Sequence, residues 1–164
     1  MNEPQHPTAK PHPGFEWRWK YFDDLTTAEV YAMLAARSEV FVIEQNCLYG
    51  DIDGLDIQAW HLFALGHHEG RPKLAGYLRV LLPDDSDADI RIGRVLTTAN
   101  FRGMGLGNQL LERAVGHIAK QWPGVPMRLH AQAHLQAFYG AFGFKPVSDV
   151  HEEDGIPHVW MRSA

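Results

Sequence analysis

The residues best suited to chemistry in this sequence form a glycine-rich turn, Arg102-Gly103-Met104-Gly105-Leu106-Gly107-Asn108. Glycines at alternate positions let successive backbone N–H groups face one concavity, and the start of a helix adds roughly half a positive charge. Phosphate is the natural ligand of such a turn. A P-loop would need Lys and then Ser or Thr where Asn108 and Gln109 stand, and a GxGxxG motif would need glycine at Leu110. A structural turn without a ligand is the alternative.

Cysteine and histidine give weaker signals. Cys47 is the only cysteine, so no internal disulfide can form, which favours a reducing compartment and a cytoplasmic location. Cys47 has no evident base partner, which favours an ordinary thiol over a nucleophile. No further ligand stands at a recognisable spacing from His130 and His134, so the sequence predicts no metal site.

The glycine-rich turn must be held between a strand and a helix, and the sequence predicts both. A β-rich run at 90–97 precedes the turn. After the turn, one helical face carries Leu106, Leu110, Ala114 and Ile118 before Pro123-Gly124 ends the helix.

The rest of the chain alternates strands and helices. Aromatic residues at every second position predict a first strand, and the capping box Thr26-Thr27-Ala28-Glu29 predicts a first helix. The expected elements are a strand at 15–21, a helix from Thr27 to about Val40, an acidic loop at 47–58, strands at 59–65, 74–82 and 127–131, a helix at 134–142, and a closing hairpin of 144–150 and 158–161 around Asp154-Gly155. This order indicates an α+β fold.

Length and charge restrict the function further. The 164 residues suit a single domain, and the proline-rich segment 1–14 is expected to be a disordered tail. No apolar run is long enough for a membrane span, and a net charge of -5 argues against nucleic-acid binding. Residues 39–90 carry a net charge of -7 and residues 91–145 carry +6. We interpret these as one region for a cation and one for an anion.

Two motifs resemble a known family. The strand Val95-Leu96-Thr97 followed by Arg102-x-x-Gly105-x-Gly107 resembles the acetyl-coenzyme A signature of the GCN5-related N-acetyltransferases, the GNAT superfamily. The run 138–144 resembles the family's second landmark, a helix that ends in Tyr-x-x-x-Gly-Phe. The segments 37–45, 51–54, 132–136 and 153–158 resemble the ElaA-like subgroup.

The resemblance covers nearly everything from Phe15 onward and implies one GNAT domain at 15–164. It implies a mixed, mostly antiparallel central sheet of six to seven strands with helices on both faces. It also implies acetyl-coenzyme A (CoA) as the acyl donor. In the family the strand beside the turn binds the pantetheine arm, which maps to Val95, Leu96 and Thr97. The turn, residues Arg102 to Asn108, wraps the pyrophosphate, and His134, Phe138 and Tyr139 are further expected cofactor contacts.

The implied reaction moves an acetyl group directly from the thioester to a primary amine within a ternary complex. By the family pattern Tyr139 protonates the departing sulfur, although it could be only a core aromatic. Glu44 is the first candidate for the base, with His61 and Asp53 as alternatives. The acidic stretch favours a small amine, polyamine or lysine-like acceptor. The expected acceptor contacts are Glu44, Gln45, Asp51, Asp53, His61, Arg79 and His158.

Two other functions fit the same sequence. An acyl-homoserine-lactone synthase is a related fold, and its Arg-x-x-x-Phe spacing is loosely echoed by Arg37 and Phe41. A non-catalytic acyl-CoA sensor would keep the cleft without requiring Tyr139 as an acid. The sequence does not decide between a monomer and a homodimer, and it does not identify the amine or the acyl-chain preference.

Overall fold

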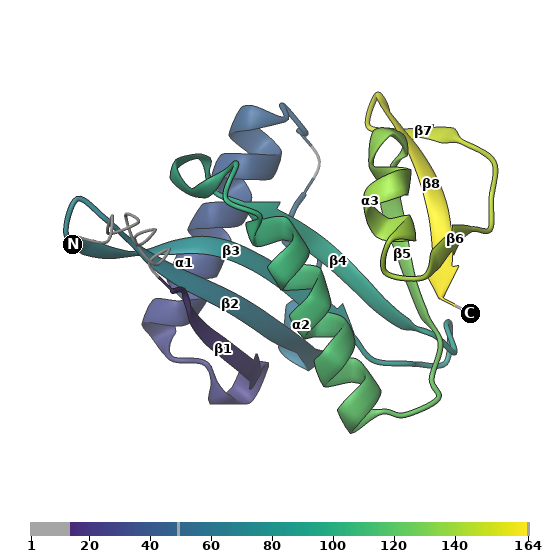
Figure 1. Cartoon of the computed structure of the whole chain (residues 1–164), viewed down its shortest axis with the longest axis horizontal. Coiled ribbons are helices and arrows are strands. Elements are labelled where there is room, and N and C mark those ends of the chain that lie inside the picture. The colour runs from purple at the N-terminus through teal and green to yellow at the C-terminus, as the bar shows by residue number, and fades with distance from the viewer. Residues whose placement is uncertain (1–13, 49, 164) are drawn as a thin grey trace, which may run out of the picture.

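The computed structural model describes residues 14–48 and 50–163, so the expected tail at 1–14 lies, apart from Gly14, outside the described residues (Figure 1). The strands are β1 (Glu16–Tyr21), β2 (Ala59–His68), β3 (Arg71–Leu81), β4 (Ile90–Thr97), β5 (Met127–Gln132), β6 (Phe144–Pro146), β7 (His151–Glu153) and β8 (Ile156–Ser163). The helices are α1 (Thr27–Arg37), α2 (Leu106–Gln121) and α3 (Gln136–Gly140). Single 3-10 turns lie at Phe22–Asp24, Asp56–Gln58, Ala99–Phe101 and Ala133–Leu135.

The described strands form one eight-stranded sheet in the order β1-β2-β3-β4-β5-β8-β6, with β7 also paired to β8. The pair β4–β5 is parallel, and the other pairs are antiparallel. The predicted α+β class with a mixed, mostly antiparallel sheet is confirmed. The strand number exceeds the expected six to seven because β6 and β7 pair with different parts of β8 and count as two strands. Between them, the backbone N–H of Val147 still donates to the Trp160 carbonyl oxygen at 2.8 Å.

Helices cover both faces of the sheet, as predicted (Figure 1). On one face, Met33 of α1 packs with Tyr77 and Leu96 of the sheet. On the other face, α2 lies close to β3 because Gly76 has no side chain. A Cβ atom at Gly76 would come within 2.9 Å of Leu110. The cores on the two faces of the sheet are stabilised by the burial of apolar side chains, which is the main favourable term in folding.

The first helix begins where the sequence predicts and changes form near its end. Thr26 and Glu29 form a complete capping box. The α-helix ends at Arg37, and the chain continues as π-helical turns over Ser38–Glu44. The backbone N–H of Gln45 therefore bonds to the carbonyl oxygen of Val40, five residues earlier. Such widened turns are frequent at functional sites, and this one delivers its last residues to a cavity.

Glu29 should make the fold sensitive to acid. Burial opposes its charged form, but hydrogen bonds from the Thr26 backbone, Lys20 and Arg18 lower the pKa of Glu29 to about 2. A carboxyl whose folded pKa is depressed stabilises the fold above its unfolded pKa, and this stabilisation is lost as the pH falls toward 2. We expect Glu29→Gln to lower the free energy of unfolding by about 1 to 3 kcal/mol at pH 7. Urea unfolding should show this difference shrinking as the pH falls from about 4.5, and a pH-independent difference would contradict the assignment.

Candidate functional site

The sheet opens between β4 and β5. These parallel strands pair at three positions, Ile90–Ile92 against Met127–Leu129, and then diverge (Figure 1). A cavity of about 640 Å³ occupies the opening. Residues 93–97 of β4 form one wall, and Leu129, His130 and Gln132 of β5 form part of the other. Unpaired strand edges present backbone donors and acceptors to a ligand.

A β-bulge shapes the β4 wall. The register between β3 and β4 shifts between Tyr77 and Arg79, and Arg94 has a φ of 51°, in the left-handed region. A non-glycine residue there is strained and must be held by its surroundings. Nε of Arg94 lies 2.9 Å from Asp51 Oδ1, and its Nη2 donates to the Asp51 carbonyl oxygen at 3.1 Å. The acidic loop therefore holds the bulge in place.

A buried arginine–aspartate cluster anchors that loop. The Arg37 side chain is 0% exposed and donates to Asp51 Oδ2 at 2.8 Å and to Asp56 Oδ1 at 2.6 Å. Arg79 donates to Asp56 at 3.0 Å and to Asp53 at 2.8 Å. Burial would raise the pKa of Asp53 and Asp56, but the arginine hydrogen bonds lower it below the usual range. Asp53 and Asp56 are therefore ionised, and the arginines neutralise their charge.

This cluster corrects part of the predicted acceptor site. Asp53 and Arg79 bind each other and do not line the cavity. His61 is fully buried, with Nδ1 2.6 Å from the Tyr77 hydroxyl and Nε2 2.9 Å from the Asp56 carbonyl oxygen. Burial also lowers the pKa of His61. Neither His61 nor Asp53 lines the cavity, so the fold does not bring these two alternative bases to it.

Glu44 reaches the cavity but has a strong partner. Nη2 of Arg102 donates to Glu44 Oε1 at 2.6 Å and to the Thr97 carbonyl oxygen at 2.9 Å. The pair joins the π-helical segment Ser38–Glu44 to the end of β4. An amine would therefore have to compete with the Arg102 guanidinium for the Glu44 carboxylate. Glu44, the first candidate for the base, lines the cavity as one half of an ion pair.

The glycine-rich turn has the predicted form. Gly103 and Gly105 have φ values of 77° and 74°, which favour glycine. No side chain caps the start of α2, so its first N–H groups are available to an anion. The Phe138 ring lies 3.6 Å from the position that a Cβ atom on Gly107 would occupy. Arg102 lines the cavity, whereas residues 103–108 and Phe138 are not among its lining residues.

Tyr139 lies at the cavity on α3 and is 7% exposed. Its ring packs edge-on against Phe138, with centroids 5.0 Å apart. Burial raises the pKa of Tyr139 to about 12. The phenol therefore keeps its proton at neutral pH and can donate it. His134, another predicted cofactor contact, also lines the cavity.

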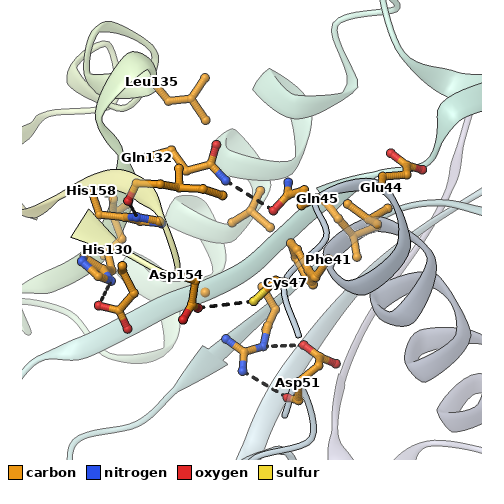
Figure 2. Close-up of a pocket in the computed structure, with 18 of the residues that line it drawn as sticks. Phe41, Glu44, Gln45, Cys47, Asp51, His130, Gln132, Leu135, Asp154 and His158 are labelled. Carbon is orange, nitrogen blue, oxygen red and sulfur yellow. Dashed lines mark hydrogen bonds and ion pairs between the residues drawn. The ribbon is translucent and has the colours of Figure 1, made fainter. Parts of the chain in front are cut away.

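Two polar contacts cross the cavity and were not predicted. The thiol of Cys47 donates to Asp154 Oδ2 at 3.3 Å, and the Gln132 amide lies 3.5 Å from Gln45 Oε1 (Figure 2). Both connect the segment after α1 to the β5–β8 half of the sheet. Cys47 thus has a carboxylate neighbour that sequence spacing did not reveal, because 107 positions separate the two residues.

The fold also assembles a group that could hold a metal ion, against the expectation of no such cluster. Ligand atoms of His130, His151 and Glu153 lie within 4.8 Å of one another. Nε2 of His130 and Nε2 of His151 are 2.7 Å apart, which is a hydrogen-bond separation. The two rings therefore bind each other in this arrangement. The β7–β8 hairpin creates this proximity, so the spacing along the chain could not show it.

These features fit an acyl-CoA. The open edge of β4 offers backbone groups to an extended arm, and the uncapped start of α2 offers N–H groups to phosphates. Tyr139 lines the cavity between β4 and β5, together with Val95, Leu96 and Thr97. Nothing in this arrangement requires a nucleophile on the protein.

Comparisons with known proteins identify the class. A protein-family model described as an acetyltransferase (GNAT) domain matches residues 25–164, so the chain belongs to the GNAT acetyltransferases. The predicted resemblance is therefore confirmed, and this family supports acyl transfer from an acyl-CoA.

The relatives are ElaA-like, as the resemblance implied. The chain is 43% identical over 146 residues to the protein ElaA of Escherichia coli K12, covering 89% of this chain and 94% of that protein. A crystal structure of an acyl-CoA N-acyltransferase from Pseudomonas aeruginosa is similar, with 46% identity and a TM-score of 0.85. The crystal structure of E. coli ElaA has 40% identity and a TM-score of 0.83. Each match covers 92% of this chain and 99% of the other.

None of the described helices is both long and apolar enough to cross a membrane.

Proposed function

We propose that this protein transfers an acetyl group from acetyl-CoA directly to a primary amine, with Tyr139 as the general acid. The observation that carries the proposal is the buried, protonated phenol of Tyr139 in the opening between β4 and β5. Tyr139 is the residue that the family motif assigns to the acid. A positioned acid or base typically contributes 10²- to 10⁴-fold to a rate.

The proposed reaction occurs in one complex. The amine nitrogen attacks the thioester carbonyl carbon, the C–N bond forms, and the carbonyl oxygen becomes an oxyanion. The C–S bond then breaks, and the sulfur takes the Tyr139 proton. The edge of β4 at Val95, Leu96 and Thr97 would hold the pantetheine arm. Backbone N–H groups from Arg102 to Asn108 would bind the pyrophosphate.

We place the amine at the hairpin side of the cavity. Of the carboxylates that line it, Glu44 and Asp51 are ion-paired with arginine. Asp154 contacts the Cys47 thiol, and Glu153 lies 3.8 Å from His130 Nδ1. Glu153 and Asp154 are therefore better placed than Asp51 to attract a cationic acceptor. Gln45 and His158 also line the cavity.

The test is release of CoA thiol from acetyl-CoA in the presence of a panel of amines, amino acids and lysine peptides. The proposal predicts release that depends on one class of amine, with mass spectrometry detecting the acetylated product. Coenzyme binding without release for any amine would contradict it and favour the acyl-CoA sensor. Turnover with an acyl donor other than acetyl-CoA would correct the donor.

A substitution at Gly105 should test the phosphate site. Gly105 has a φ of 74°, and its Cβ position is open. Asn tolerates this conformation better than most residues, and Asp has the same shape with a negative charge. We expect Gly105→Asp to weaken CoA binding at least about tenfold more than Gly105→Asn, because like charges repel at close range. Isothermal calorimetry with CoA measures both, and equal affinities would place the phosphates elsewhere.

A further inference from the structure

His158 has a hydrogen-bonding pattern that fixes its lone pair. Its Nδ1 lies 2.7 Å from the Ile156 carbonyl oxygen. A carbonyl oxygen only accepts, so Nδ1 carries the hydrogen and the neutral ring keeps its lone pair on Nε2. In the part of the chain that the structure describes, Nε2 has no hydrogen-bond partner. The half-buried side chain lines the cavity (Figure 2).

The carboxylates of the cavity are less suitable proton acceptors. Glu44 is held by Arg102 at 2.6 Å, and Asp51 is held by Arg37 and Arg94. An ammonium would therefore have to compete with a guanidinium for these carboxylates. Among the described residues, Glu153 and Asp154 have no arginine partner, but Asp154 accepts from the Cys47 thiol at 3.3 Å and Glu153 lies 3.8 Å from His130 Nδ1.

The two other histidines that line the cavity differ from His158. His130 uses Nε2 in its 2.7 Å contact with His151, and burial lowers the pKa of His130. His134 is exposed and precedes α3, the helix that carries Tyr139. His158 is thus the cavity histidine whose tautomer a backbone carbonyl dictates.

We propose that His158 is the general base that takes the proton from the acceptor amine. This inference rests on the proposed acetyl transfer and adds the second catalytic residue to it. Nε2 removes one proton from the ammonium, and the neutral nitrogen then attacks the thioester. After the attack, Tyr139 gives its proton to the departing sulfur, and the second proton of the nitrogen passes to the resulting phenolate. His158 releases the first proton to solvent.

The groups around His158 suit this cycle. The ring of His130 on β5 lies 4.7 Å from that of His158. His151 on β7 is its register partner, and Glu153 and Asp154 follow on the same hairpin. A protonated His130 would repel a transient imidazolium at this distance. The lowered pKa of His130, caused first by its burial, keeps that ring neutral.

The experiment is His158→Asn. The Asn amide can replace Nδ1–H at the Ile156 carbonyl, so the substitution removes Nε2 and keeps the backbone contact. We expect kcat at pH 7 to fall about 10²-fold or more, with calorimetric CoA affinity unchanged. Added imidazole should restore part of the rate of His158→Ala, because a free base can enter the space that the ring leaves, and a purely structural role would not give this rescue.

Matched variants separate the possible outcomes. His134→Ala and Glu44→Gln should show no rescue by imidazole. A wild-type kcat in His158→Asn, or no rescue of His158→Ala by imidazole, would overturn the assignment of His158 alone. Rescue of His134→Ala by imidazole would move the base to that residue. No thiol release by the wild type with any amine would overturn the acetyl transfer itself.

Discussion

Tyr139→Phe should lower kcat by about 10²- to 10⁴-fold while CoA affinity stays nearly constant. The phenyl ring keeps the edge-on contact with Phe138, so packing changes little. Only the hydroxyl is removed, and burial is the cause that raises its pKa to about 12. The wild-type phenol is therefore a protonated donor throughout the neutral range, and its loss leaves the sulfur to depart without a positioned proton.

Thiol release measures kcat for this comparison, and calorimetry measures affinity for CoA. Tyr31→Phe is the matched control, because Tyr31 is 79% exposed and away from the cavity. It removes the same hydroxyl and should change neither quantity. A Tyr139→Phe protein with wild-type kcat would show that Tyr139 only packs. A protein that lost coenzyme binding would show a role in the binding site instead.

Local patterns predicted the elements well. Alternating aromatic residues placed β1, the capping box placed the start of α1, and glycines placed the turn before α2. These features depend on residues within a few positions of one another, so they are visible in one sequence. The family resemblance placed Tyr139 at the cofactor, and in the fold Tyr139 lines the cavity.

Long-range pairing accounts for what the sequence did not show. The segment at 39–90 and the segment at 91–145 have opposite net charge. In the fold, Asp51 contacts Arg94 and Glu44 contacts Arg102, so the two segments neutralise each other in part. Charge along the chain therefore predicted neither where an amine could bind nor which carboxylates are free. That information requires the contacts between segments.

The acceptor side depended on the same kind of information. The Asp154-Gly155 turn was visible as a hairpin, but its neighbours were not. Folding brings Asp154 to Cys47 and brings His151 to His130. The π-helical continuation of α1 also moves Gln45 toward Gln132. Each contact joins residues at least twenty-one positions apart, beyond the reach of helical or strand periodicity.

Arg37→Met should cause the largest loss of stability among these substitutions, about 3 to 5 kcal/mol in the free energy of unfolding. The wild-type guanidinium is 0% exposed and bonds to Asp51 and Asp56. Its removal leaves both carboxylates buried with less compensation. Arg162 supplies the control: its side chain is 47% exposed beside Asp89, so Arg162→Met should lower the free energy of unfolding much less than Arg37→Met does.

Urea unfolding of the three proteins measures these differences, and equal losses in the two variants would show that the buried cluster is not special.

A second effect follows from the position of Asp51. This residue also holds Arg94 in its left-handed conformation at the β4 bulge. Because the bulge forms part of the cavity wall, Arg37→Met should weaken CoA binding under conditions where the protein is still folded, whereas Arg162→Met should not. The cluster would then stabilise the fold and the coenzyme site through the same aspartate.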